Sequence, residues 1–220
     1  MKNYLNIIKD VSLFRNIEFD QLESMLSCLG TRKEKYEAGA VIILAGEQIQ
    51  DVGIIIDGSA QIIQEDIMGN RAIIAKLGIG DIFSENLACA NVMESPVTVI
   101  ANTPTTVIFI GVKRIITTCS SACIFHTTLI GNLLKVLAEK NIYLNNKMNI
   151  LSQRSIKEKI MTYLTSQADK ADSLKFTIPF NRNELADFIC VDRSALSREL
   201  ANMQDEGLLN YHKNEFELFD

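Results

Sequence analysis

The sequence predicts an α+β protein in which an antiparallel β-roll is followed by a long helix and then by a small helical unit that ends in a β-hairpin. Three observations lead to this prediction. Residues 31–111 hold short β-branched runs separated by glycines, residues 113–151 hold a helical apolar repeat, and residues 152–220 hold two helix-start signals and a hairpin pattern. We therefore place the domains at residues 1–115, 116–151 and 152–220.

The composition is that of an ordinary globular protein. Hydrophobic residues make up 47% of the 220 residues and charged residues 22%, which excludes a disordered chain. The net charge of −5 argues against a basic surface for indiscriminate nucleic-acid binding. No apolar run approaches the roughly 20 residues that span a bilayer, and no apolar export signal follows Met1. Five scattered cysteines fit a reduced compartment, so we expect a cytoplasmic protein with no membrane partner.

A helix and a turn are predicted before the first strand. Asp20 occupies a position that suits an N-cap, and Glu23 follows three residues later as in a capping box. Apolar residues then recur with the spacing of an amphipathic helix, at Leu22, Met25, Leu26 and Leu29.

The β-branched runs predict the strands of a sandwich or roll. They occupy residues 41–44, 54–56, 60–63, 73–74, 97–100 and 106–110, with turn residues about every 8–12 positions. Asp57-Gly58 and Gly69-Asn70 are dipeptides of the hairpin type, in which glycine supplies a positive φ.

The long helix carries two apolar stripes. The first has alternating steps of four and three residues, and this 3.5-residue period is that of a dimer seam in which Asn141 sets the register. The alternative is an amphipathic helix buried in its own monomer. The second stripe, Leu129, Leu133 and Val136, is expected to pack on the β-roll. The predicted dimer seam consists of Ile130, Leu134, Leu137, Asn141, Leu144, Met148 and Leu151.

Residues 152–220 have the pattern of a winged helix-turn-helix. Asn181 with Glu184 three residues later starts one helix, and Asp192 is expected to cap the next. In that second helix, positions 193/197 and 194/198 are i, i+4 pairs on an exposed strip. Arginine can bind guanine through two hydrogen bonds, and serine can serve a base or a phosphate. The predicted DNA contacts are Asn181, Arg182, Arg193, Ser194, Ser197 and Arg198.

Ion pairing is the alternative interpretation of this strip. Asp192 and Glu199 lie close enough in sequence to pair with the arginines, which would make the strip an ordinary solvated face.

Taken together, these motifs resemble the cyclic-AMP receptor/fumarate-nitrate-reduction regulator (CRP/FNR) family over nearly the whole chain. The resemblance implies a double-stranded β-helix roll like that of cyclic-nucleotide-binding domains, and a homodimer that binds a two-fold symmetric site on double-stranded DNA. It also makes RNA polymerase a candidate partner. The matching runs are Phe14-Arg15-Asn16-Ile17, Tyr36-Glu37-Ala38-Gly39, Ala45-Gly46-Glu47, Ile56-Asp57-Gly58, Gly80-Asp81-Ile82-Phe83-Ser84-Glu85, Asn183-Glu184-Leu185-Ala186, Arg193-Ser194-Ala195-Leu196-Ser197-Arg198-Glu199-Leu200 and Glu206-Gly207-Leu208-Leu209.

The chain departs from the family pattern where cyclic nucleotides bind. That pattern pairs a glutamate, here Glu85, with a downstream arginine that neutralises the cyclic phosphate, but Ser95 occupies the arginine position. No basic residue lies between Lys76 and Lys113, and a buried phosphate without a cation is costly. We therefore expect a small effector other than cyclic AMP; the alternative is a regulator with a collapsed pocket and no effector. Its predicted pocket consists of Phe83, Ser84, Glu85, Asn86, Ser95, Val97, Thr98, Leu144 and Asn145.

The helix-turn-helix departs from the family pattern in the turn, in the base contacts and at Glu199, which occupies a position that is often apolar. Cys190 replaces the usual turn glycine, and Ser194 replaces a glutamate that the family often has. Because serine cannot replace that glutamate as a strong acceptor from cytosine, we expect a different half-site.

The cysteines offer a second sensing hypothesis. Cys119, Cys123 and His126 share the i, i+4, i+7 spacing of one helix face, which could bind a metal or haem or act as a thiol switch. The alternative is a packing cluster at a helix start. An iron-sulfur cluster needs about four thiolates, and only Cys28 precedes the roll, so we do not expect such a cluster. No other cofactor is predicted.

An enzyme is the remaining alternative. A cupin-like metalloenzyme would use histidine ligands in the roll, and residues 31–111 contain no histidine. We therefore expect a non-enzymatic regulator.

Overall fold

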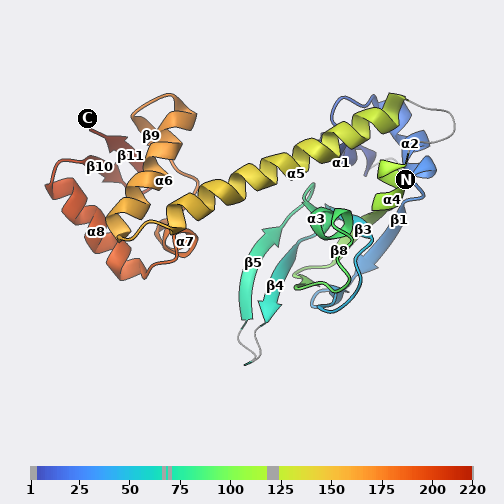
Figure 1. Cartoon of the computed structure of the whole chain (residues 1–220), viewed down its shortest axis with the longest axis horizontal. Coiled ribbons are helices and arrows are strands. Elements are labelled where there is room, and N and C mark those ends of the chain that lie inside the picture. Colours follow the sequence, from blue (N-terminus) through green and yellow to red (C-terminus); the bar gives the residue numbers. More distant parts are fainter. Residues whose placement is uncertain (1–3, 66–67, 69–70, 118–123, 220) are drawn as a thin grey trace. The chain divides into compact units, whose positions relative to one another are not determined.

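The computed structural model describes residues 4–65, 68, 71–117 and 124–219 (Figure 1). The chain divides into two compact units, Met1–Ala138 and Glu139–Asp220. The division falls within the long helix α5 (Ile124–Leu151), so the two ends of this helix belong to different units.

The first unit is an antiparallel roll of two four-stranded sheets. One sheet has the order β1-β8-β3-β6, from β1 (Arg32–Tyr36), β8 (Thr105–Gly111), β3 (Asp51–Asp57) and β6 (Ile82–Phe83). The other has the order β2-β7-β4-β5, from β2 (Val41–Ile43), β7 (Thr98–Ala101), β4 (Ala60–Glu65) and β5 (Arg71–Leu77). The predicted α+β class with an antiparallel roll is thereby confirmed. The apolar pattern missed β1, whose sequence RKEKY suits an exposed sheet edge.

Short helices complete the roll. They are α1 (Leu5–Asp10), the 3-10 helix η1 (Ser12–Phe14), α2 (Phe19–Cys28), α3 (Glu85–Cys89) and α4 (Val112–Ile116). Helix α2 begins after Glu18 as its N-cap, so the prediction that Asp20 caps it is wrong; Asp20 lies in the first turn, where its charge suits the helix dipole.

The start of α5 is built into the core of the roll. Leu129, Leu133 and Val136 are buried in one cluster with the residues of α1, α2 and the two sheets, as predicted for the second stripe. The side-chain amide of Asn132 adds hydrogen bonds to the carbonyls of Leu13 (3.0 Å) and Arg15 (2.7 Å). These contacts anchor this part of α5 to the segment that leads into α2.

The turn at Asp57-Gly58 joins the two sheets rather than two strands of one sheet. Strand β3 belongs to one sheet and β4 to the other, so the prediction of a hairpin is wrong, although Gly58 has the expected positive φ of 80°. The connection between β3 and β4 can be short because the chain reverses its direction as it passes from one sheet to the other. The other predicted turn, Gly69-Asn70, lies outside the described residues.

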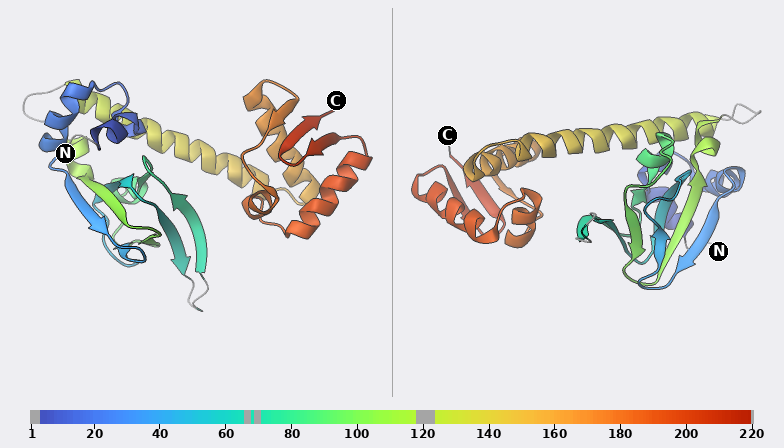
Figure 2. Two further views of the ribbon diagram at one scale, coloured as in Figure 1. Left: turned by 180° about the vertical axis from the view of Figure 1, so that it is seen from behind. Right: turned by 60° about the horizontal axis from the view of Figure 1, so that its bottom comes forward.

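The second unit is a helical cluster with a small antiparallel sheet (Figure 2). Its helices after α5 are α6 (Ile156–Ala171), α7 (Arg182–Phe188) and α8 (Arg193–Asp205). The sheet has the order β10-β11-β9, from β10 (Leu209–His212), β11 (Glu215–Leu218) and β9 (Lys175–Thr177). This is the predicted winged helix-turn-helix, with the β10–β11 hairpin as its wing.

Two capping boxes set the helix starts of this unit. Ser155 and Glu158 bond reciprocally at α6, and the same bonds lower the pKa of Glu158. Asn181 and Glu184 do so at α7, as predicted. Asp192 is the N-cap residue of α8, but its side chain makes no capping hydrogen bond, which corrects the expectation for that residue.

We predict that alanine at Gly58 destabilises the roll far more than alanine at Gly39. Both glycines have φ near 80°, so both substitutions impose left-handed strain of about 1 kcal/mol or more. A Cβ at Gly58 would also lie 2.2 Å from the Pro104 carbonyl oxygen, whereas at Gly39 it would meet nothing within 4 Å. Thermal unfolding of the two variants measures the difference, and equal losses of stability would contradict the proposed clash.

Candidate nucleic-acid interface and effector cavity

The strip on α8 is exposed at the start of the helix. Leu196, Leu200 and Met203 bury the opposite face in the core of the unit, which turns Arg193, Ser194 and Arg198 toward solvent; Ser197 is half-buried. Within the described part of the chain, neither arginine forms an ion pair, so the predicted alternative of pairing with Asp192 or Glu199 is not seen. The strip therefore offers two charged guanidinium groups and a hydroxyl to a partner.

Arg182 and Asn181 are used inside the unit instead. The guanidinium of Arg182 lies over the rings of Tyr211 (4.7 Å) and Phe216 (5.3 Å) and donates to the carbonyl of Lys213 at 2.9 Å. Burial among these groups lowers its pKa. The Asn181 side chain accepts from the backbone N–H of Glu184. These contacts hold the wing and α7 in place, and whether the two residues also contact DNA stays a prediction.

The turn between α7 and α8 contains one residue with a left-handed backbone conformation. Cys190, which stands where that pattern has glycine, has φ 55° in the left-handed region. Backbone hydrogen bonds hold it there, from Cys190 to Asp187 and from Val191 to Ala186. Cysteine at this position is thus accommodated in a left-handed turn.

The same holds at the start of α3 in the first unit. Ser84 replaces the family's glycine and has φ 60°. Its hydroxyl is buried and donates to the Asp51 carbonyl at 2.7 Å. The next residue, Glu85, is 2% exposed, and burial of the Cys89 thiol together with the charge of Glu85 raises the pKa of Cys89. The glutamate is thus inside the protein, at the place where the family pattern puts it.

A cavity of about 170 Å³ lies beside this segment. Its polar lining comes from Ser84, Asn86 and Ser95, and the rest is apolar: Ile43, Ile62, Ile74, Leu87, Pro96, Val97 and Val99. No lysine or arginine among the described residues lines it. It is smaller than the roughly 300–1,000 Å³ of sites for drug-sized ligands, which indicates a small and mostly apolar occupant.

Ser95 closes its own loop. Its hydroxyl donates to the Val97 carbonyl at 2.7 Å, and its backbone N–H donates to the Glu47 carbonyl at 2.8 Å. Ser95 is 3% exposed, so its side chain is buried. The residue at the family's phosphate-binding position thus already uses its hydroxyl and its backbone N–H in hydrogen bonds within the roll.

Five residues of the predicted pocket do not line the cavity. The ring of Phe83 is packed in the core against Phe109 (6.3 Å) and over Gly53, where a Cβ would lie 2.2 Å from it. Thr98 instead accepts from the backbone N–H of Ala45 at 3.1 Å. Leu144 and Asn145 belong to the second unit, where Asn145 donates to Asn141 at 2.8 Å. Glu85 is buried at the start of α3 without lining the cavity.

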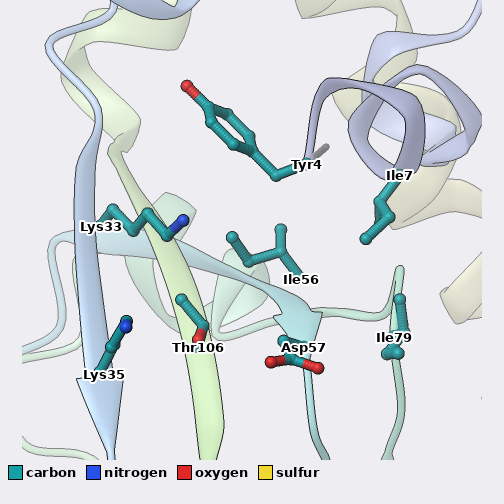
Figure 3. Close-up of a pocket in the computed structure, with 8 residues that line it drawn as sticks. All are labelled: Tyr4, Ile7, Lys33, Lys35, Ile56, Asp57, Ile79 and Thr106. Carbon is teal, nitrogen blue, oxygen red and sulfur yellow. The ribbon is translucent and has the colours of Figure 1, made fainter. Parts of the chain in front are cut away.

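A second hollow, of about 390 Å³, lies on the other sheet of the roll (Figure 3). Lys33 and Lys35 extend from β1 toward it, with Tyr4 and Ile7 on one side and Asp57 on another. The ammonium of Lys33 lies 4.9 Å from the centre of the Tyr4 ring. Because these cations belong to a different sheet, they do not supply the charge that is missing beside Ser95.

The predicted seam is largely exposed. Leu134, Leu144 and Met148 are 62%, 60% and 64% exposed, and Asn141 is also exposed. Ile130, Leu137 and Leu151 are half-buried. The alternative, a helix buried in its own monomer, describes the other stripe, and in this stripe Leu137 also packs against the core of the roll.

The cysteine hypothesis falls mostly outside the described part of the chain. Cys119 and Cys123 are not among the described residues, and His126 is buried on α5. None of the helices within the described ranges has both the length and the apolar character needed to cross a membrane.

Two family models match successive parts of the chain. The model of the cyclic nucleotide-binding domain matches residues 33–121, and that of the Crp-like helix-turn-helix domain matches residues 158–220. No curated protein matches the sequence.

Solved structures show the same fold at low identity. The Thermus thermophilus catabolite activator protein is 19% identical with a TM-score of 0.57, covering 94% of this chain and 93% of its own. The c-di-GMP responsive regulator CLP of Xanthomonas campestris is 17% identical with a TM-score of 0.57, covering 92% and 100%. CprK complexed with OCPA is 15% identical with a TM-score of 0.63, covering 90% of each chain. With a cyclic nucleotide-binding domain and a Crp-like helix-turn-helix domain in this order, the chain belongs to the CRP/FNR family of transcription regulators.

Proposed function

We propose that this protein is a homodimeric transcription regulator that binds a two-fold symmetric DNA site. The observation that carries the proposal is the strip on α8, where Arg193 and Arg198 are exposed beside Ser194 and form no ion pair with a described residue. Exposed arginines at the start of a recognition helix suit guanine edges in the major groove. The negative net charge leaves little general attraction to phosphates, so affinity depends on these contacts and on pairing two units.

The exposed seam on α5 supports the dimer. Leucine and methionine side chains that are more than half exposed on one side of a long helix are stabilised when a second copy covers them. Asn141 within the seam would favour one register of the two helices. A dimer also spaces two copies of α8 for successive major grooves.

The effector is proposed to be a small, mostly apolar molecule in the 170 Å³ cavity. A cyclic phosphate would lie there without a cation, and Ser95 is engaged in its own loop. The structurally similar regulators respond to or bind different small molecules: CLP is a c-di-GMP responsive regulator, and CprK forms a complex with OCPA. This supports an effector other than cyclic AMP. Binding would act by shifting the population of DNA-competent dimers.

The remaining attributes follow from regulation of genes. The protein would act in the cytoplasm on double-stranded DNA, with RNA polymerase as a further partner, and it would have no enzymatic activity.

We predict that Arg198→Ala weakens binding to an operator, selected from random duplexes, by about 1–3 kcal/mol without unfolding the protein. The lost group is an exposed guanidinium that the core does not need. Lys175→Ala, on an exposed residue of β9, is the matched control and should leave affinity within about twofold of the unmodified protein. Affinity of Arg198→Ala equal to that of the control, measured by fluorescence anisotropy, would remove this residue from the interface.

We predict that Leu144→Glu converts the dimer to monomer. The dimer would bury this position, and burying a carboxylate there costs about 3 kcal/mol or more. Ile142→Glu is the matched control: Ile142 is also 60% exposed on α5 but lies outside the seam. Sedimentation velocity distinguishes the two. Dissociation by both variants, or by neither, would show that this seam does not pair the chains.

We predict no saturable binding of cyclic AMP below about 100 μM in isothermal titration, since its phosphate would be desolvated without a compensating charge. Micromolar or tighter affinity would contradict the proposed character of the cavity.

A further inference from the structure

A groove of about 350 Å³ lies within the second unit, away from the exposed strip of α8. Its walls come from the last turns of α5, from α6, and from the segment that leads into and along α7. The residues that matter below are Tyr143, Lys147, Tyr163, Phe180 and Phe188. Its volume falls within the range of sites that enclose a small organic ligand.

One side of the groove is an aromatic cluster. The rings of Phe180 and Phe188 are 4.9 Å apart, and each also packs against Tyr163, at 6.0 and 5.4 Å. Both phenylalanines are only half-buried, so ring faces and edges remain open to a ligand. Tyr143 is 53% exposed on the α5 side. A flat apolar group could pack against these rings with favourable geometry.

One residue that lines the groove, Tyr163, carries a hydroxyl with no partner in the described protein. Tyr163 is 2% exposed, and its hydroxyl oxygen is buried without a hydrogen bond to any described residue. An unsatisfied buried donor is costly, and native proteins rarely leave one without a purpose. Burial raises the pKa of Tyr163 to about 12, so this hydroxyl keeps its proton at neutral pH and can donate it to an acceptor.

Charge at the rim favours an anion. The ammonium of Lys147 lies 5.2 Å from the centre of the Phe188 ring, and Lys170 is a second lining cation, against one lining carboxylate, Glu139. An acceptor that meets both a donor hydroxyl and lysine is best supplied by a carboxylate.

We propose that this groove binds a small aromatic carboxylic acid, with the ring against Phe180 and Phe188 and the carboxylate toward Lys147 and the Tyr163 hydroxyl. The site is separate from the roll cavity and does not depend on the proposed function. Because the groove joins the end of α5 to the segment that precedes the recognition helix, an occupant would stiffen this connection.

Isothermal titration of the full chain with indole-3-acetate and phenylacetate, to about 5 mM, tests the proposal without DNA. The matched neutral probe is phenylacetamide. We expect saturable binding of both acids and at least about tenfold weaker binding of the amide, as for loss of one charge-assisted hydrogen bond. No saturable binding of either acid, or equal binding of the amide, would overturn the proposal.

Three variants locate the site. Lys147→Gln should weaken the acids about tenfold, while Lys175→Gln, on β9 outside the groove, should not. Tyr163→Phe should weaken them as well, yet raise the melting temperature of the free protein because it removes the unsatisfied hydroxyl. Acid binding as tight as that of the unmodified protein, in either Lys147→Gln or Tyr163→Phe, would overturn the proposed place of the carboxylate. So would a change in sedimentation coefficient of Tyr143→Gln, since a second copy would then cover this face.

Discussion

Helix α5 contributes buried residues to two separate cores, one in each unit, and this constraint decides which of its side chains remain exposed. In the first unit, Leu129, Leu133 and Val136 are part of the core of the roll; in the second, Ile150 is part of the core beneath the helix-turn-helix. Among the described residues of the seam, Leu137 packs against the core of the roll, while Leu134, Leu144 and Met148 stay exposed. A partner helix is a physically reasonable way to cover these exposed side chains.

The first unit has the fold of its family, but several of its residues differ from the family pattern. Ser84, which stands where that pattern has glycine, adopts a left-handed conformation, and a hydrogen bond to Asp51 satisfies its buried hydroxyl. Glu85 remains buried at the start of α3, but the position that would carry the phosphate-binding arginine is a serine held in its own loop. Fold and ligand are thus decided by different residues, so a family's fold does not specify what a member binds.

In the helix-turn-helix unit, the arginines differ in whether they make contacts inside the protein. Arg193 and Arg198 are free of ion pairs within the described ranges, whereas Arg182 is held by two rings and a carbonyl of the wing. The charge of Arg182 therefore helps to position the wing, whereas the two arginines of the strip on α8 have no such internal contact among the described residues.

The order of the parts, most strands, the capping box at Asn181 and both stripes of α5 could be predicted from the residues alone, because these features depend on local periodicity and on hydrogen bonds between near neighbours. Other features arise only when distant segments pack together. Packing places Phe83 in the core against Gly53, makes Gly58 turn between sheets, and stacks Arg182 on Tyr211. The groove at Tyr163 is likewise invisible in the sequence, since its walls come from segments that periodicity does not relate.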